Sequence, residues 1–365
     1  MKVVSIAREA AADSGLDEAR AVDAPAALPV RPGEDGSTAV GEAALAEVRR
    51  LLAAWLAHEP GARLGHDPEE LHQLRVTARR LDATLGLFKE YLPAPLLRAR
   101  KTAKAVLRSL GATRDLDVQL VALSAYCEKL PEEERLALEP LSARFTHERE
   151  RARTRMIRAL DSEATRRWIQ TLTTATEAPP AAHGAAVTAT VTAVVAQRVR
   201  RRYRRLRKAV RRLRASSPMD DYHRVRRRAK QLRYALESGA VMFGKPVDEM
   251  LKALRRMQDK LGANQDAHMA RNHLTALAAD PHCALPPATL FQMGKLAEHH
   301  ARITSGAHAT VTKSWRKVRG RRWKALRNRL GEFEQGAPES PEPVPGAAAA
   351  VDNGSPTAEV PRLSH

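Results

Sequence analysis

His72-Gln-Leu-Arg-Val-Thr-Ala-Arg-Arg-Leu81 and His223-Arg-Val-Arg-Arg-Arg-Ala-Lys-Gln-Leu232 are two versions of one segment, 151 residues apart in the chain. The same offset, with no gap, places Leu110-Gly-Ala-Thr-Arg-Asp115 on Leu261-Gly-Ala-Asn-Gln-Asp266. Two matches in a single register are hard to obtain by chance, even in a biased composition. They predict an internal duplication.

Each copy of the first segment has the apolar spacing of an amphipathic helix, with steps of three and four residues. In the first copy the apolar stripe comprises Leu71, Leu74, Ala78, Leu81, Leu85 and Phe88, and in the second Tyr222, Val225, Ala229, Leu232 and Leu236. Asp67 with Pro68 is a favourable helix start, and Asp220 and Asp221 place acidic groups at the start of the second helix.

The composition between the two ends of the chain favours helix throughout, because Ala, Leu, Arg and Glu dominate and no strand-like alternation occurs. We therefore expect an all-α fold of two duplicated antiparallel helical bundles, 39–176 and 185–331, separated by a Pro-Pro linker at 177–184. Residues 1–38 and 332–365 are rich in Ala, Pro and acidic residues, and they predict disordered extensions.

The charge is concentrated in the helical part of the chain. The whole sequence carries a formal charge of +20, while residues 1–38 contribute −3 and 332–365 contribute −5, which leaves +28 between them. Such self-repulsion is explained by a polyanionic partner. The alternative is an arginine-rich protein whose cations only cover ordinary solvated faces.

Two cysteines, Cys127 and Cys283, form no disulfide framework and favour a reduced, cytoplasmic setting. The chain shows neither a signal peptide nor an apolar run of membrane-spanning length, so no membrane partner is expected.

A polar stripe follows one residue behind each apolar stripe, at the border of the buried face. It consists of His72, Arg75 and Arg79 in the first copy and of His223, Arg226, Lys230 and Arg233 in the second. The helices that follow add Lys101, Lys104 and Arg108, and then Lys252, Arg255 and Arg256. One such stripe would suggest a solvated flank whose Arg stems cover the core. Its repetition in both halves favours a binding surface.

Residues 198–214 form the densest basic run, and Val199, Tyr203, Leu206, Val210 and Leu213 give this run one packed side. Four of its cations either line the same groove as the second stripe or face solvent: Arg201, Arg205, Lys208 and Arg212. Trp315 and Trp323 lie in a second basic segment, where they either stack on nucleic-acid bases or, as their helical spacing favours, pack in the core.

The pattern H-x-L-R-V-x-x-R-R-L, followed by L-G-x-x-R-D-L-D-V, resembles the CHAD family of histidine-containing helical domains over roughly residues 40–330. The resemblance implies two bundles related by pseudo-twofold symmetry, a basic central groove that binds inorganic polyphosphate, and association with polyphosphate granules. With the neighbouring cations included, the candidate polyphosphate-binding residues are His72, Arg75, Arg79, Arg80, Lys101, Lys104, Arg108, Arg114, Arg201, Arg205, Lys208, Arg212, His223, Arg226, Arg227, Lys230, Arg233, Lys252 and Arg255.

Three positions depart from a symmetric site. Asp82 stands where the second half has Arg233, and Gln265 and His268 stand where the first half has Arg114 and Asp117.

Catalysis is not expected. Asp115, Asp117 and Asp266 each follow a Leu-Gly pair interpreted as a helix end, where an acidic residue caps the next helix or pairs with an arginine; a metal-binding or catalytic role is the alternative. The chain has no HExxH motif, no P-loop and no Cys/His set with zinc spacing, so no cofactor or metal is expected.

Three functions therefore compete. Non-catalytic polyphosphate binding leads, a nucleic-acid or nucleoid-associated role comes second, and a phosphohydrolase acting on polyphosphate comes third. An aromatic content of only 4% argues against extensive base stacking. A coat on polyester storage granules, which the family resemblance also suggests, is a further alternative to polyphosphate granules.

Overall fold

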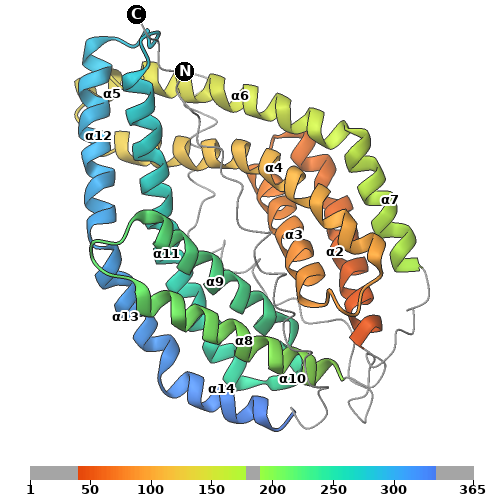
Figure 1. Cartoon of the computed structure of the whole chain (residues 1–365). Coiled ribbons are helices and arrows are strands. Elements are labelled where there is room, and N and C mark those ends of the chain that lie inside the picture. The colour runs from red at the N-terminus through yellow and green to blue at the C-terminus, as the bar shows by residue number, and fades with distance from the viewer. Residues whose placement is uncertain (1–39, 178–189, 334–365) are drawn as a thin grey trace, which may run out of the picture.

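The computed structural model describes residues 40–177 and 190–333, which form helices joined by turns, with no β-strand in these two ranges (Figure 1). The all-α prediction is therefore confirmed. The predicted disordered extensions and most of the predicted linker lie outside the described residues.

The helices fall into two series. The first comprises α2 (Val40–Leu64), α3 (Pro68–Leu87), α4 (Ala94–Cys127), the short α5 (Glu132–Leu136), α6 (Glu139–Asp161) and α7 (Glu163–Glu177). The second comprises α8 (Val191–Arg212), α9 (Met219–Ser238), the short α10 (Ala240–Phe243), α11 (Lys245–Ala279), α12 (Pro287–Ser305), α13 (Ala307–Arg319) and α14 (Arg321–Gly331).

The two series match in register and in packing. Helices α8, α9 and α11 each begin 151 residues after α2, α3 and α4. Within the first half α3 packs on both α2 and α4, and α4 packs on α6 and α7; within the second, α9 packs on both α8 and α11, and α11 packs on α12 and α13. The sequence offset is thus reproduced as an offset between helices with the same neighbours.

The principal contacts between the halves join helices to their own copies: α2 to α8, α3 to α9, α4 to α11 and α6 to α12. An arrangement in which each element meets its equivalent is the signature of a twofold relation. Atom-by-atom superposition of the halves stays a prediction, but the contacts are those that a pseudo-twofold axis requires.

Local sequence explains why α3 and α9 form where they do. The side chain of Asp67 accepts a hydrogen bond from the backbone N–H of Glu69 (2.7 Å), and Pro68 opens the helix, as predicted. In α9 the acidic residues Asp220 and Asp221 lie in the first turn. The apolar stripes of both helices are buried in one continuous core.

The basic run 198–212 is a helix with one packed side, also as predicted. Val199 and Leu206 of α8 are fully buried, and Tyr203 stacks between the rings of Trp315 and Trp323, with ring centroids 5.7 and 3.5 Å away. The prediction that the tryptophans are core residues is confirmed for Trp315, which is buried, while Trp323 is partly buried and packs against the core.

The interpretation of the Leu-Gly pairs as helix ends is wrong. Gly111 lies inside α4 and Gly262 lies inside α11, each well away from the end of its helix. A single glycine lowers helix propensity without stopping a long helix whose other residues are packed. The aspartates that follow are consequently not caps of a next helix.

No helix in the described part of the chain is long and apolar enough to cross a membrane.

Candidate anion-binding site

The two polar stripes meet where α3 packs against α9. Arg75 and Arg79 follow the buried Leu74 and Ala78 on α3, and Arg226 and Lys230 occupy the corresponding positions on α9. All four side chains are partly buried. The prediction that the stripes of the two halves approach one another agrees with this packing and with the mutual electrostatics of the four residues. These four residues are called the shared cluster below.

Lys230 is the most perturbed member of the shared cluster. Its pKa is lowered from 10.5 to about 6, first by desolvation and then by the charges of Arg79, Arg226, Arg233 and Arg75. Two of these arginines belong to the first half and two to the second. A lysine surrounded in this way is largely neutral at pH 7 unless an anion joins it.

Arg79 is affected by the same surroundings. Its pKa is lowered mainly by desolvation and then by Arg75, with a smaller contribution from Arg226 of the other half. Among the described residues, no carboxylate lies within ion-pair distance of Arg79 or of Lys230. The centre of the shared cluster therefore holds positive charge that the described protein does not neutralise directly.

The two copied glycines lie beneath the two copied arginines. A Cβ atom added at Gly111 would come 4.0 Å from Nη2 of Arg75, and one added at Gly262 would come 3.6 Å from Nη2 of Arg226. Each guanidinium thus packs against the helix that follows in its own half. The Nε atoms of both arginines are buried without a hydrogen-bond partner. Equivalent unsatisfied donors in both copies mark a place where an anionic acceptor would be stabilising.

Two carboxylates lie at the edge of the shared cluster. Asp115 pairs with Arg75 (Oδ1 to Nη1, 3.0 Å) while keeping 55% of its side chain exposed. Asp266, its copy, has a raised pKa because desolvation by the surrounding helices outweighs the opposing influence of Arg226 and Lys230. Asp115 thus has one of the two structural roles predicted for it, the ion pair with an arginine.

The histidines that begin the two stripes are partly buried. The pKa of His223 is lowered, first by desolvation, although a side-chain hydrogen bond with Gln265 opposes the shift. His223 is thus neutral at pH 7 and can donate one hydrogen bond. Gln265, a departure from the symmetric pattern, acts here as its partner.

The other candidate residues are distributed around this centre. Arg233 and Arg255 both approach the buried carboxylate of Glu237, at 3.6 and 3.9 Å. Arg80 and Arg114 are partly buried. The remaining candidates on these helices are exposed: Lys101, Lys104, Arg108, Arg227 and Lys252. On α8, Arg205 lies near Arg201 and Arg198 and near Arg228 of α9. Arg201, Lys208 and Arg212 are exposed.

Three arginines that the sequence did not single out extend the basic region. The pKa of Arg202 is lowered to about 10 by desolvation and by the charges of Arg198, Arg205 and Arg100. Arg198 is buried and pairs with Glu90, while Arg100 comes from α4 of the other half. Arg198 and Arg202 stand at the border of the buried face of α8, before the apolar residues instead of after them. Arg198 and Arg202 could have been predicted from the sequence by considering basic residues on both sides of each apolar stripe, and not only those one residue after it.

The departure at Asp82 is compensated locally. Its Oδ1 accepts a hydrogen bond from Nε of Arg100 at 2.6 Å. The first half thus pairs Asp82 with Arg100 at the position where the second half pairs Arg233 with Glu237.

The third predicted acidic residue is structural. Asp117 is buried, and Nε of Arg149 on α6 donates to it at 2.6 Å. The described ranges contain no group of three or more His, Cys, Asp or Glu side chains placed to hold a metal ion.

The described chain is all-α, and helices α3 and α9, which correspond at the 151-residue offset, meet at a basic cluster. The CHAD domain profile matches residues 46–275 of the chain. This protein belongs to the CHAD domain family, whose members in general are binding domains that bind polyphosphate.

Two solved structures resemble the protein along most of its length. One is a crystal structure of the CHAD domain from the plant Ricinus communis, with 26% identity and a TM-score of 0.64, covering 80% of this chain and 96% of that one. The other is PptA from Streptomyces chartreusis, with 20% identity and a TM-score of 0.62, covering 76% of this chain and all of that one, which shows a shared fold. No curated protein matches the chain significantly.

Proposed function

We propose that this protein binds inorganic polyphosphate without hydrolysing it, at the shared cluster where α3 and α9 meet. The observation that carries the proposal is the state of Lys230, which is desolvated among four arginines drawn from both halves. Such an arrangement is unfavourable in the free protein and becomes favourable when a dense anion enters it.

The symmetry of the cluster supports a polymer as the ligand. Arg75 and Arg226 hold equivalent positions in the two halves and both act on Lys230, so an extended anion bound at the cluster would interact with cations of both halves. A long ligand gains from effective concentration as it contacts cations along both stripes, whereas a short phosphate chain makes fewer of these contacts. Long polyphosphate should therefore compete better than triphosphate, even at equal concentration of phosphate groups.

Two observations favour polyphosphate over nucleic acid and over hydrolysis. Trp315 is buried and Trp323 stacks on Tyr203, so little of these two rings is left on which bases can stack. The carboxylates of the cluster are few and pair with or lie beside its cations, which favours binding over metal-assisted hydrolysis. Residence at polyphosphate granules, in the cytoplasm, follows as part of the proposal; association with polyester storage granules is the alternative location.

The test is a salt titration of polyphosphate binding with Arg75→Ala/Arg226→Ala and a control of equal charge, Arg321→Ala/Arg327→Ala, on the exposed surface of α14. The cluster variant should lose far more affinity than the control. Its salt dependence should also become shallower, by about 0.7 in log–log slope for each phosphate that the variant no longer neutralises. Equal losses of affinity in both variants would show that diffuse charge does the binding, and tighter binding of DNA at physiological salt would favour the nucleic-acid function.

A further inference from the structure

The outer face of α8 carries a second concentration of positive charge. Five exposed cations occupy positions i, i+3, i+4, i+7 and i+8 of this helix, and they line one cavity of about 420 Å³: Arg204, Arg207, Lys208, Arg211 and Arg212. Lys208 lies about half a turn of the helix away from the buried Val199 and Leu206. This outer arginine face is thus directed away from the core.

These five cations have no ionic partners in the described parts of the protein. No carboxylate there lies within ion-pair distance of any of them, although other exposed arginines have such partners, for example Arg144 with Glu148 at 2.7 Å. Adjacent like charges on one helix face are destabilising. The face therefore costs stability that only counterions or a bound anion can offset.

Helix α2, which corresponds to α8 in the first half, shows whether a helix at this position needs the five cations in order to pack. In the 151-residue register the five cations correspond to Ala53, Leu56, Ala57, Pro60 and Gly61 of α2. The packed sides of the two helices agree, since Val48 corresponds to Val199 and both are fully buried. Because α2 packs in the same way without any of these charges, the outer arginine face serves something other than the fold.

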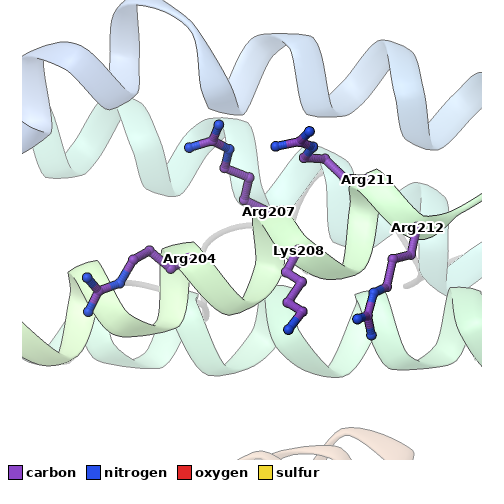
Figure 2. Close-up of a pocket in the computed structure, with 5 residues that line it drawn as sticks. All are labelled: Arg204, Arg207, Lys208, Arg211 and Arg212. Carbon is purple, nitrogen blue, oxygen red and sulfur yellow. The ribbon is translucent and has the colours of Figure 1, made fainter.

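The side chains are arranged to accept a linear ligand. Figure 2 shows Arg207 and Arg211 extending to one side of α8, toward the helices of the C-terminal part, while Lys208 and Arg212 extend to the opposite side. Residues four apart lie about one turn, or 5.4 Å, apart along the axis. Two rows of cations with a cavity along the helix suit a flexible chain of closely spaced phosphates.

We infer that the outer arginine face is a second polyphosphate-binding surface, so that one protein molecule holds two segments of polymer and bridges them. This inference rests on the proposed function of the shared cluster. The five cations belong to a single helix of the second half, whereas the shared cluster draws on α3 and α9. The surface exposes only cations around its cavity and no aromatic ring, which favours phosphate polymer over single-stranded nucleic acid.

The experiment compares four full-length proteins: the wild type, the cluster variant Arg75→Ala/Arg226→Ala, an outer-face variant and a matched control. The outer-face variant replaces all five cations with Gln, a good helix former. The control removes the same charge from exposed positions of α13 and α14, by substitution with Gln at Arg316, Lys317, Arg321, Lys324 and Arg327. Calorimetric titration with short polyphosphate gives the number of sites, and light scattering with long polyphosphate measures bridging.

The wild type and the control should bind two short chains and scatter strongly with long polymer. The outer-face variant should bind one short chain, and its scattering should fall at least about tenfold, because a single site cannot bridge. The cluster variant should likewise retain one site, provided by the outer face.

Each other outcome has a definite meaning. Two sites in the outer-face variant, or equal losses in the control, would overturn the second surface while leaving the shared cluster intact. Loss of all binding in the outer-face variant, with none in the cluster variant, would instead overturn the proposed function at α3 and α9. Tighter binding of single-stranded DNA than of polyphosphate by the cluster variant would assign the outer face to nucleic acid and overturn the inference.

Discussion

The two halves of the protein share helices and packing but treat their cations differently. In the first half Arg75, Arg100 and Arg149 pair with Asp115, Asp82 and Asp117. In the second half the positions corresponding to Asp82 and Asp117 hold Arg233 and His268.

The difference indicates that the two halves contribute unequally to stability and, in the proposed function, to binding. Ion pairs in the first half stabilise the fold, because each of these carboxylates has an arginine partner. In the second half Arg233 and Arg255 share the carboxylate of Glu237, and the five exposed cations of α8 add further positive charge. The comparison predicts that removing the carboxylate of a buried first-half ion pair reduces stability more than the matched substitution in the second half.

The largest effect is expected at the buried ion pair of the first half. Asp117→Ala removes the buried partner of Arg149, which among the described residues keeps only its pair with the exposed Glu150, and breaking a buried pair in this way costs about 3 kcal/mol. Urea unfolding measures the loss. The matched substitution in the second half, His268→Ala, removes a partly exposed side chain and should change the free energy of unfolding by less than about 1 kcal/mol. Similar losses at both positions would remove the proposed division between the halves.

The second effect concerns Lys230 and has a definite sign with pH. Its folded pKa of about 6 lies below the unfolded value of 10.5, so between these values the unfolded chain holds the extra proton and stability rises with pH. Lys230→Met removes this burden. The variant should be more stable than the wild type, most clearly below pH 6, with the advantage shrinking by up to about 1.4 kcal/mol per pH unit toward pH 10.5.

Polyphosphate binding should favour protonation of Lys230, whereas folding disfavours it. A bound anion favours the charged amine, so the wild type should take up a proton on binding above pH 6, and its affinity should fall as pH rises. Calorimetry in two buffers of different ionisation enthalpy counts the protons. Identical proton uptake in Lys230→Met would assign the linkage to another group, of which His223 is the nearest candidate by its lowered pKa.

Much of this arrangement can be predicted from the sequence, because it depends on local sequence features. The apolar steps from Leu71 to Phe88 fix which side of α3 is buried, and the single 151-residue offset carries that result to α9. Asp67 and Pro68 fix where α3 begins.

The rest depends on tertiary packing. Periodicity places Arg75 and Arg226 at the border of a buried face, but not against the glycines of α4 and α11, because that contact is made across two helices. The continuous helices through Gly111 and Gly262 were missed because packing overrides the low propensity of one residue. Arg100 could not be linked to the α8 arginines, since nothing local relates two helices so far apart in the chain.

A smaller effect tests whether the two halves can be interconverted. Asp82→Arg gives the first half the residue that the second half has in Arg233, and it releases Arg100 from its partner. Polyphosphate affinity should rise severalfold at low salt, with a log–log salt slope steeper by about 0.7 for each additional phosphate that the variant neutralises. The partly exposed ion pair of Asp82 and Arg100 contributes modestly to stability, so its loss should lower the free energy of unfolding by only about 1 kcal/mol. Unchanged affinity would mean that this end of the stripe does not reach the ligand.

The smallest effect is expected from Asp115, and it also separates binding from hydrolysis. Asp115 is more than half exposed, so its pair with Arg75 contributes little to stability, at most about 1 kcal/mol. Asp115→Asn should free the guanidinium for phosphate and strengthen polyphosphate binding by a small factor. Asp266→Asn should act in the same direction, because that carboxylate at the edge of the cluster repels an approaching anion. In a hydrolase the same substitutions would abolish turnover, since a carboxylate among cations would be the group that positions water or metal. Binding titrations and a phosphate-release assay, each with and without Mg²⁺ or Mn²⁺, are therefore read together. Tighter binding with no phosphate release in any variant agrees with a role in which Asp115 and Asp266 only reduce the positive charge of the shared cluster. Sustained release by the wild type that disappears in either variant would make these aspartates catalytic, and the contrast between the halves would then concern chemistry instead of charge.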